Sequence, residues 1–360
     1  MSVTKLRNSN IELLRCICML MIVYLHLLIH GVNGEFAAFN GNEVLPTTLL
    51  ESFTTIFCMV AVNVFVIISG YFGINIFDKS GNIVYSKILK NYLIVLFYSI
   101  CISAVFLLVG RISLKEFVFS FLPVVTGKWW FATCYIVLVL ITPFINFLIE
   151  QNWKNKYLYV VILLTIFCTY LFEGKDGNKV LGLQSLGFST VLICYCIGRL
   201  IYLFNQSDAK LLKKNSIVYF IGYVVCCIVS FSGVVFLYLI TRKNYWFRVS
   251  IYSSPITLLA SIFLFLTFLN LKIKNAKCIN ILGHTTFGIY LIHESPFIRP
   301  VLYKFINAYQ YKSEYGGGVI FICLFFAICV FLVCGAIDFI RNLIFRIISS
   351  IQKKLFGIGE

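Results

Sequence analysis

Residues 53–77 read FTTIFCMVAVNVFVIISGYFGINIF, a run that contains no Asp, Glu, Lys or Arg. A helix that crosses a lipid bilayer needs about 20 consecutive, mostly apolar residues. Inside lipid the backbone polar groups must be satisfied within the segment itself, and a helix does this. The run therefore predicts a transmembrane helix.

The same template finds about ten candidate spans along the chain. They cover residues 11–30, 53–77, 88–110, 129–149, 156–173, 185–204, 216–240, 251–270, 281–303 and 317–345. Hydrophobic residues make up 60% of the sequence and charged residues only 12%, about half the charged share of a soluble domain. We therefore predict an all-α integral membrane protein, with one transmembrane domain over residues 1–350 and a short cytoplasmic tail over residues 351–360.

The positive charge of the chain predicts membrane topology rather than a nucleic-acid partner. The net charge is +16, but the basic residues fall in short loops between apolar runs and form no basic tail. The loop that holds Glu35, Glu43 and Glu51 has no Lys or Arg, whereas alternate loops are rich in both. This bias places both termini in the cytoplasm.

Three ionisable residues lie in or beside the first predicted span: Glu12, Arg15 and His26. Arg15 and His26 are eleven residues apart, about three helical turns plus 20°, so they share one helix face about 16 Å apart. Ionisable groups inside the membrane usually face the bundle interior and mark functional sites. Two alternatives stay open: Arg15 as a residue that snorkels to the interface, and His26 as a hydrogen-bonded contact between helices.

Four motifs extend this pattern along the chain. They read NIELLR at residues 10–15 followed by His26, AVNVFVIISGYF at 61–72, KWWF at 128–131 leading to Tyr135 and PFIN at 143–146, and GHTTFGIYLIH at 283–293. Their order and spacing resemble the membrane acyltransferase-3 family. The resemblance implies a membrane O-acyltransferase that moves an acyl group, usually acetyl from acetyl-CoA, to a hydroxyl of a surface polysaccharide or lipid-linked glycan precursor. It also implies a plasma-membrane location, with acetyl-CoA as donor substrate and no permanently bound cofactor.

We expect the catalytic residues to be His26, as general base, with Glu12, His293 and Glu294. Imidazole suits this role because its unperturbed pKa lies near neutrality. Glu294 is a possible carboxylate partner of His26, although nothing in the sequence brings the two together, and packing is the alternative for His293. Pro296 predicts a kink beside these residues, because it removes a backbone hydrogen bond.

The remaining candidate site residues bind the substrates. Arg15, Lys87 and Lys90 would hold the phosphates of the donor, although many family members have Arg-x-x-Arg where this chain has Lys87 and Lys90; topology charge explains the two lysines equally well. The candidates for the acceptor are Trp129, Trp130, Tyr135, Asn63 and Ser69. An aromatic belt also accounts for the tryptophans, and Asn63 and Ser69 fall on different helix faces. No metal-binding motif is present, and we predict no metal.

Two rival functions remain open at this point. A transporter or flippase for a glycan or its precursor would also need many spans and cationic helix ends, but the internal repeats typical of transporters are not found. A scaffolding subunit of a polysaccharide complex would tolerate changes at Arg15 and His26.

Overall fold

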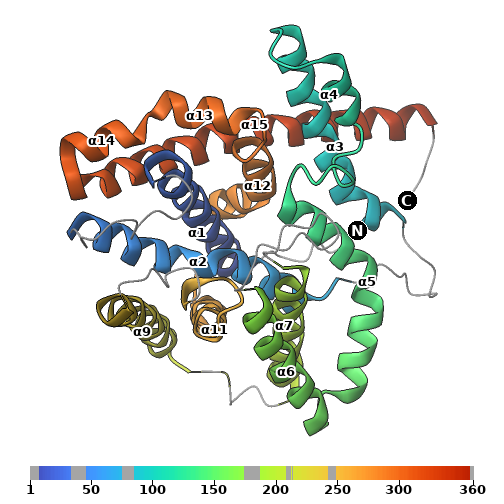
Figure 1. Cartoon of the computed structure of the whole chain (residues 1–360). Helices are drawn as coiled ribbons and strands as arrows, with labels where there is room; N and C mark the ends of the chain where they lie inside the picture. The colour runs from blue at the N-terminus through green and yellow to red at the C-terminus, as the bar shows by residue number, and fades with distance from the viewer. Residues whose placement is uncertain are drawn as a thin grey trace.

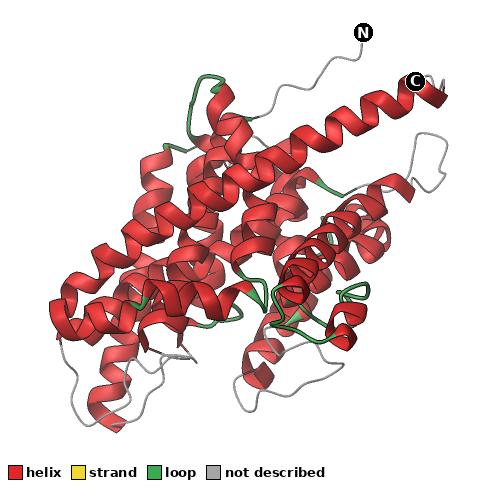
Figure 2. Ribbon diagram, turned by 90° about the horizontal axis from the view of Figure 1, so that it is seen from above, coloured by secondary structure: helices red, strands yellow, loops and turns green. Residues whose placement is uncertain are grey.

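The computed structural model describes residues 8–33, 46–74, 85–173, 187–207, 212, 214–241 and 249–356. Every regular element within these residues is helical (Figures 1 and 2). The elements are α1 (Ser9–His26), η1 (Leu27–Asn33), α2 (Pro46–Phe72), α3 (Tyr85–Leu108), α4 (Leu114–Phe119), α5 (Trp130–Asn152), α6 (Lys156–Glu173), α7 (Phe188–Ser207), α9 (Ser216–Thr241), α11 (Pro255–Asn270), α12 (Lys277–His293), α13 (Ile298–Ile306), α14 (Ala308–Tyr315), η3 (Gly316–Gly318) and α15 (Val319–Phe356).

Seven helices in the described residues are long and apolar enough to cross a membrane. They lie at Ser9–Val32, Leu49–Phe72, Leu89–Leu108, Trp130–Asn152, Phe188–Ser207, Ser216–Thr241 and Gly316–Ile348. Two further apolar helices, Lys156–Leu171 and Pro255–Asn270, are shorter. The all-helical membrane protein is thus confirmed, while the count of about ten spans remains a prediction.

Large apolar side chains on the outer helices face away from the bundle. Ile217 and Phe236 of α9 and Phe321 and Phe325 of α15 are each exposed over more than half of their surface. An apolar area of this extent is rare on a protein surrounded by water. Lipid is the solvent that suits these faces.

The predicted span over residues 281–303 is two helices, because α12 ends at His293 and α13 begins at Ile298. Pro296 lies between them and has no backbone N–H to continue the helical hydrogen bonds. Glu294, the residue after the helix, has φ −95° and ψ 9° and leaves the helical path. The break places His293 and Glu294 at a helix end inside the bundle.

The sequence predicts that the transmembrane domain ends at residue 350 and that a tail follows. The helix α15 passes residue 350 without interruption and ends at Phe356.

Two glycines let α12 lie close to both of its neighbours, α1 and α15. A Cβ added at Gly283 would lie 2.8 Å from the Cβ of Glu12 on α1, and one added at Gly288 would lie 2.6 Å from the Cβ of Asp338 on α15. Real Cβ atoms do not approach other atoms this closely. The helix that ends in His293 is therefore fixed against α1, the helix that carries His26 (Figure 1).

The buried carboxylate of Asp338 is neutralised by neighbours from two helices. Tyr98 on α3 donates to Asp338 Oδ1 at 2.7 Å, Arg341 Nε donates to the same oxygen at 2.8 Å, and Asn342 donates to Oδ2 at 2.8 Å. A buried charge is tolerated when it is paired and hydrogen-bonded in this way. The cluster ties α3 to α15 beside α12.

We predict that Gly283→Ala destabilises the protein, because the new methyl group must push α12 away from Glu12. Overpacking of this kind costs about 1–3 kcal/mol, which should appear as a lower midpoint for thermal unfolding in detergent. Gly233→Ala on α9 is the matched control, since the nearest atom to its added Cβ is 3.8 Å away. Equal midpoints for the two variants would show that α1 and α12 are not held as closely as described.

Candidate active site

One face of α1 lines a cavity in the centre of the bundle. Arg15, Met19, Ile22 and His26 all contribute to it, and their spacing of four, three and four residues follows one helix face. Arg15 and His26 thus lie on the same wall, as their spacing predicts. The cavity extends along α1 from the predicted cytoplasmic end, at Arg15, to the end of α1, at His26.

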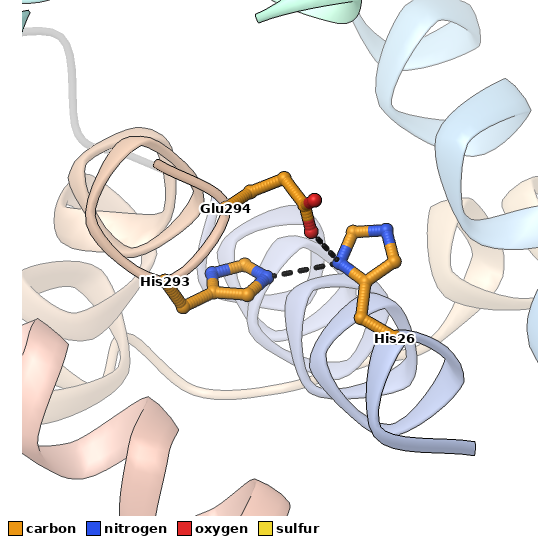
Figure 3. A group of neighbouring side chains, drawn as sticks. All are labelled: His26, His293 and Glu294. Carbon is orange, nitrogen blue, oxygen red and sulfur yellow. Dashed lines mark hydrogen bonds and ion pairs between the residues drawn. The ribbon is translucent and has the colours of Figure 1, made fainter. Parts of the chain in front are cut away.

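His26, His293 and Glu294 form a contiguous triad at the end of α1 and α12 (Figure 3). The Nδ1 atom of His26 lies 2.6 Å from Oε2 of Glu294 and 3.1 Å from Nε2 of His293. His293 and Glu294 are both buried, with exposed fractions of 0% and 7%. The first and the last of the four sequence motifs therefore meet at one point.

The hydrogen bonds of His293 determine where the protons sit in the triad. Its Nδ1 lies 2.7 Å from the carbonyl oxygen of Ile289, an acceptor, so this nitrogen carries the hydrogen. In the neutral ring Nε2 of His293 is then an acceptor, as is the carboxylate of Glu294. Both acceptors face Nδ1 of His26, which therefore carries a hydrogen and donates it.

This assignment leaves a lone pair on Nε2 of the neutral His26 ring. Figure 3 shows that nitrogen on the side of the ring away from Glu294 and His293. A histidine oriented through Nδ1 by a carboxylate, with its other nitrogen free to accept a proton, has the arrangement of the base in a catalytic triad. The geometry suits His26 for general-base chemistry. His293 lies on the Nδ1 side of the His26 ring, away from the nitrogen that would accept the proton.

Glu294 is itself held by a residue that is not among the predicted site residues. Arg299 on α13 donates from Nη1 to Oε1 of Glu294 at 2.8 Å, leaving Oε2 for His26. The signal was present in the sequence, because Arg299 is a charge within the predicted span 281–303, five residues after Glu294. Its charge also compensates that of the buried carboxylate.

Several basic residues besides His26 line the cavity. Arg15, Lys90 and His284 line it together with Asn91. The buried Nε atom of Arg15 has no hydrogen-bond partner among the described residues. Lys87 falls in α3, but its side chain lies outside the part that the structure describes.

The predicted acceptor residues separate into two groups. Trp130, Tyr135 and Ser69 line the cavity, and the hydroxyl groups of Ser69 and Tyr135 are 3.2 Å apart. Trp129 is 2% exposed and Asn63 donates to the carbonyl oxygen of Tyr252 at 2.9 Å, so neither contributes to the lining.

Glu12 also stays outside the cavity lining. It is 7% exposed and packs against Gly283, so its position suits a structural role between α1 and α12.

Within the described residues, one group of side chains could hold a metal ion. It is the same triad of His26, His293 and Glu294. Their ligand atoms lie within 4.8 Å of one another. The ligands of a tetrahedral zinc ion lie about 3.3 Å apart, as Zn–N distances of about 2.0–2.1 Å require. The 2.6 Å contact between His26 and Glu294 is shorter, so this geometry matches a direct contact between the two side chains better than a coordination shell.

A carboxylate-backed histidine in a cavity between membrane-spanning helices defines a membrane protein with an acid–base site. A family model described as an acyltransferase domain, the acyltransferase 3 model, matches residues 8–341, which include every residue of this site. The chain belongs to this family and is a membrane acyltransferase. No curated protein and no solved structure matches it. The family match gives no support to the transporter alternative.

We predict that Glu294→Gln lowers the rate of acyl transfer by about 10²- to 10⁴-fold, the range for general-base catalysis and its carboxylate partners. The amide keeps the shape of the side chain but removes the negative charge that stabilises a protonated His26. Initial rates of acyl transfer by the purified variants measure this. Glu314→Gln on α14 is the matched control, because this carboxylate is exposed and contacts Gln310. An unaltered rate in Glu294→Gln would remove the triad from the mechanism.

Proposed function

We propose that the protein transfers an acetyl group from acetyl-CoA to a hydroxyl of a surface polysaccharide or of its lipid-linked precursor in the plasma membrane. One observation carries the proposal: a single cavity is lined by the cations Arg15 and Lys90 and by the acid–base group His26. A donor with a phosphate-rich head and a thioester at the end of a long arm has this distribution of charge and reactivity.

The cationic end of the cavity suits the phosphates of CoA. Arg15 presents a planar guanidinium that can bind a phosphate with two hydrogen bonds, and its Nε donates to no group in the described residues. Lys90, on α3, adds a second charge to the lining of the same cavity. Because α1 spans about 16 Å between Arg15 and His26, an extended donor bound by its phosphates would direct the thioester toward His26.

The chemical step follows from the orientation of His26. Its Nε2 removes the proton of the acceptor hydroxyl as the oxygen attacks the thioester carbonyl carbon, and Glu294 stabilises the resulting imidazolium. The tetrahedral intermediate then expels the CoA sulfur as the C–S bond breaks. The imidazolium returns the proton to the sulfur, so His26 is neutral again after each turnover.

The aromatic side chains around the cavity suit a sugar acceptor. Trp130, Tyr135 and Tyr252 line the cavity, and Trp130 and Tyr252 lie 6.2 Å apart between ring centroids. Aromatic faces provide flat apolar surfaces next to hydroxyl groups that form hydrogen bonds. A sugar ring that stacks against one of these aromatic side chains would lie in the same cavity as His26.

We predict that cells with His26→Ala lose the O-acetyl groups of their surface glycan and keep the amount and chain length of that glycan. NMR and mass spectrometry of the isolated polysaccharide measure both, with wild-type and deletion strains for comparison. Blotting of the membrane fraction checks that the variant is present. Unchanged acetylation would refute the role of His26, and loss of the whole glycan would favour transport.

We also predict that Arg15→Gln raises the KM for acetyl-CoA by about 10- to 100-fold, as expected for the loss of hydrogen bonds between charged groups. The value of kcat should change much less, because Arg15 binds the donor far from the reacting carbon. Lys274→Gln, an exposed charge outside the cavity, is the control. A fall in kcat at constant KM would contradict the assignment of Arg15 to donor binding.

A further inference from the structure

Tyr290 has a buried hydroxyl at the wall of the active-site cavity. The residue is 5% exposed and lines the same cavity as His26. Its hydroxyl group has no hydrogen-bond partner among the described residues. A buried polar group without a partner costs about 1–3 kcal/mol, so its presence needs a reason.

One backbone group lies near this hydroxyl. The backbone of Phe131 lies close to the phenolic oxygen, although beyond an ordinary hydrogen bond. Phe131 is in the first turn of α5, where backbone N–H groups have no partner within the helix. Such an N–H can only donate, which leaves the phenolic hydrogen available to an acceptor that enters the cavity.

The position of Tyr290 along α12 fits a donor substrate that arrives from Arg15. Along α12, Gly283 lies beside Glu12 and His293 lies beside His26. Tyr290 lies three residues before His293, about 4.5 Å nearer the Arg15 end. The rings of Tyr290 and His293 are 6.3 Å apart between centroids.

The proposed acyl transfer requires a hydrogen-bond donor near the carbonyl oxygen of the thioester. When the acceptor oxygen attacks the thioester, the carbonyl electron pair moves onto oxygen, and donors aimed at this oxygen are among the largest contributors to catalysis. His293 is unsuited to the task, because its Nδ1 is bound to Ile289 and its Nε2 to His26. The hydroxyl of Tyr135 is already next to that of Ser69.

We propose that the Tyr290 hydroxyl donates a hydrogen bond to the carbonyl oxygen of the acyl donor and stabilises the oxyanion of the tetrahedral intermediate. The inference rests on the proposed function. No proton leaves Tyr290: the negative charge forms on the carbonyl oxygen and returns to the carbonyl bond as the C–S bond breaks.

Tyr290→Phe removes the hydroxyl and keeps the ring, so it separates catalysis from packing. In full-length protein we expect kcat with acetyl-CoA to fall about 10²- to 10³-fold, the usual effect of losing one oxyanion donor, with little change in KM. Tyr303→Phe is the matched control, because the Tyr303 hydroxyl is also buried without a partner in the described part of the chain but lies outside the cavity lining. A wild-type kcat in Tyr290→Phe overturns the inference, as does a loss of kcat that Tyr303→Phe reproduces.

A spectroscopic measurement tests the hydrogen bond itself. In His26→Ala protein, which binds the donor without turning it over, the infrared carbonyl stretch of bound ¹³C-acetyl-CoA should lie at lower frequency than in solution. The double variant with Tyr290→Phe should lose this shift and still bind acetyl-CoA. An unchanged shift in the double variant contradicts the role of Tyr290. Failure of the His26→Ala protein to bind acetyl-CoA would instead contradict the donor assignment.

Discussion

The close approach of α12 to α1 is the constraint on which the rest of the site depends. At one end Gly283 lets α12 lie against Glu12, and at the other end His26 meets Glu294 at 2.6 Å. Between these two points the helices run side by side, with the cavity along their shared edge. Any increase in their separation would lengthen the contact that holds the proton on Nδ1 of His26.

The break after His293 makes this contact possible at a cost in backbone hydrogen bonds. A continuous helix would direct residues 293 and 294 to different faces, about 100° apart. Because α12 stops at His293, Glu294 turns toward His26 while His293 stays buried behind it. Arg299 then supplies the charge that a buried carboxylate needs. The π-helical segment η1, which follows His26 directly, is a second irregularity of a kind that is frequent at functional sites.

Helical periodicity and hydrophobicity predicted the parts of this architecture that depend on local sequence. They predicted the membrane helices, the shared face of Arg15 and His26, and a disturbance at Pro296. They did not predict that His26 and Glu294 touch, because the contact joins α1 to the end of α12 and depends on how the bundle packs. For the same reason Asn63 and Trp129 were expected at the substrate and lie outside the cavity lining, whereas Arg299 and Tyr290 were not recognised.

The most direct test of the account is a double-mutant cycle between His26 and Glu294, measured as the rate of acyl transfer by His26→Ala, Glu294→Gln and the combined variant. Residues that act as one unit have strongly non-additive effects. Because Glu294 acts through His26, the combined variant should transfer acyl groups at the same residual rate as His26→Ala alone. A combined variant whose loss equals the product of the two single losses would show that the residues act independently and would contradict the account.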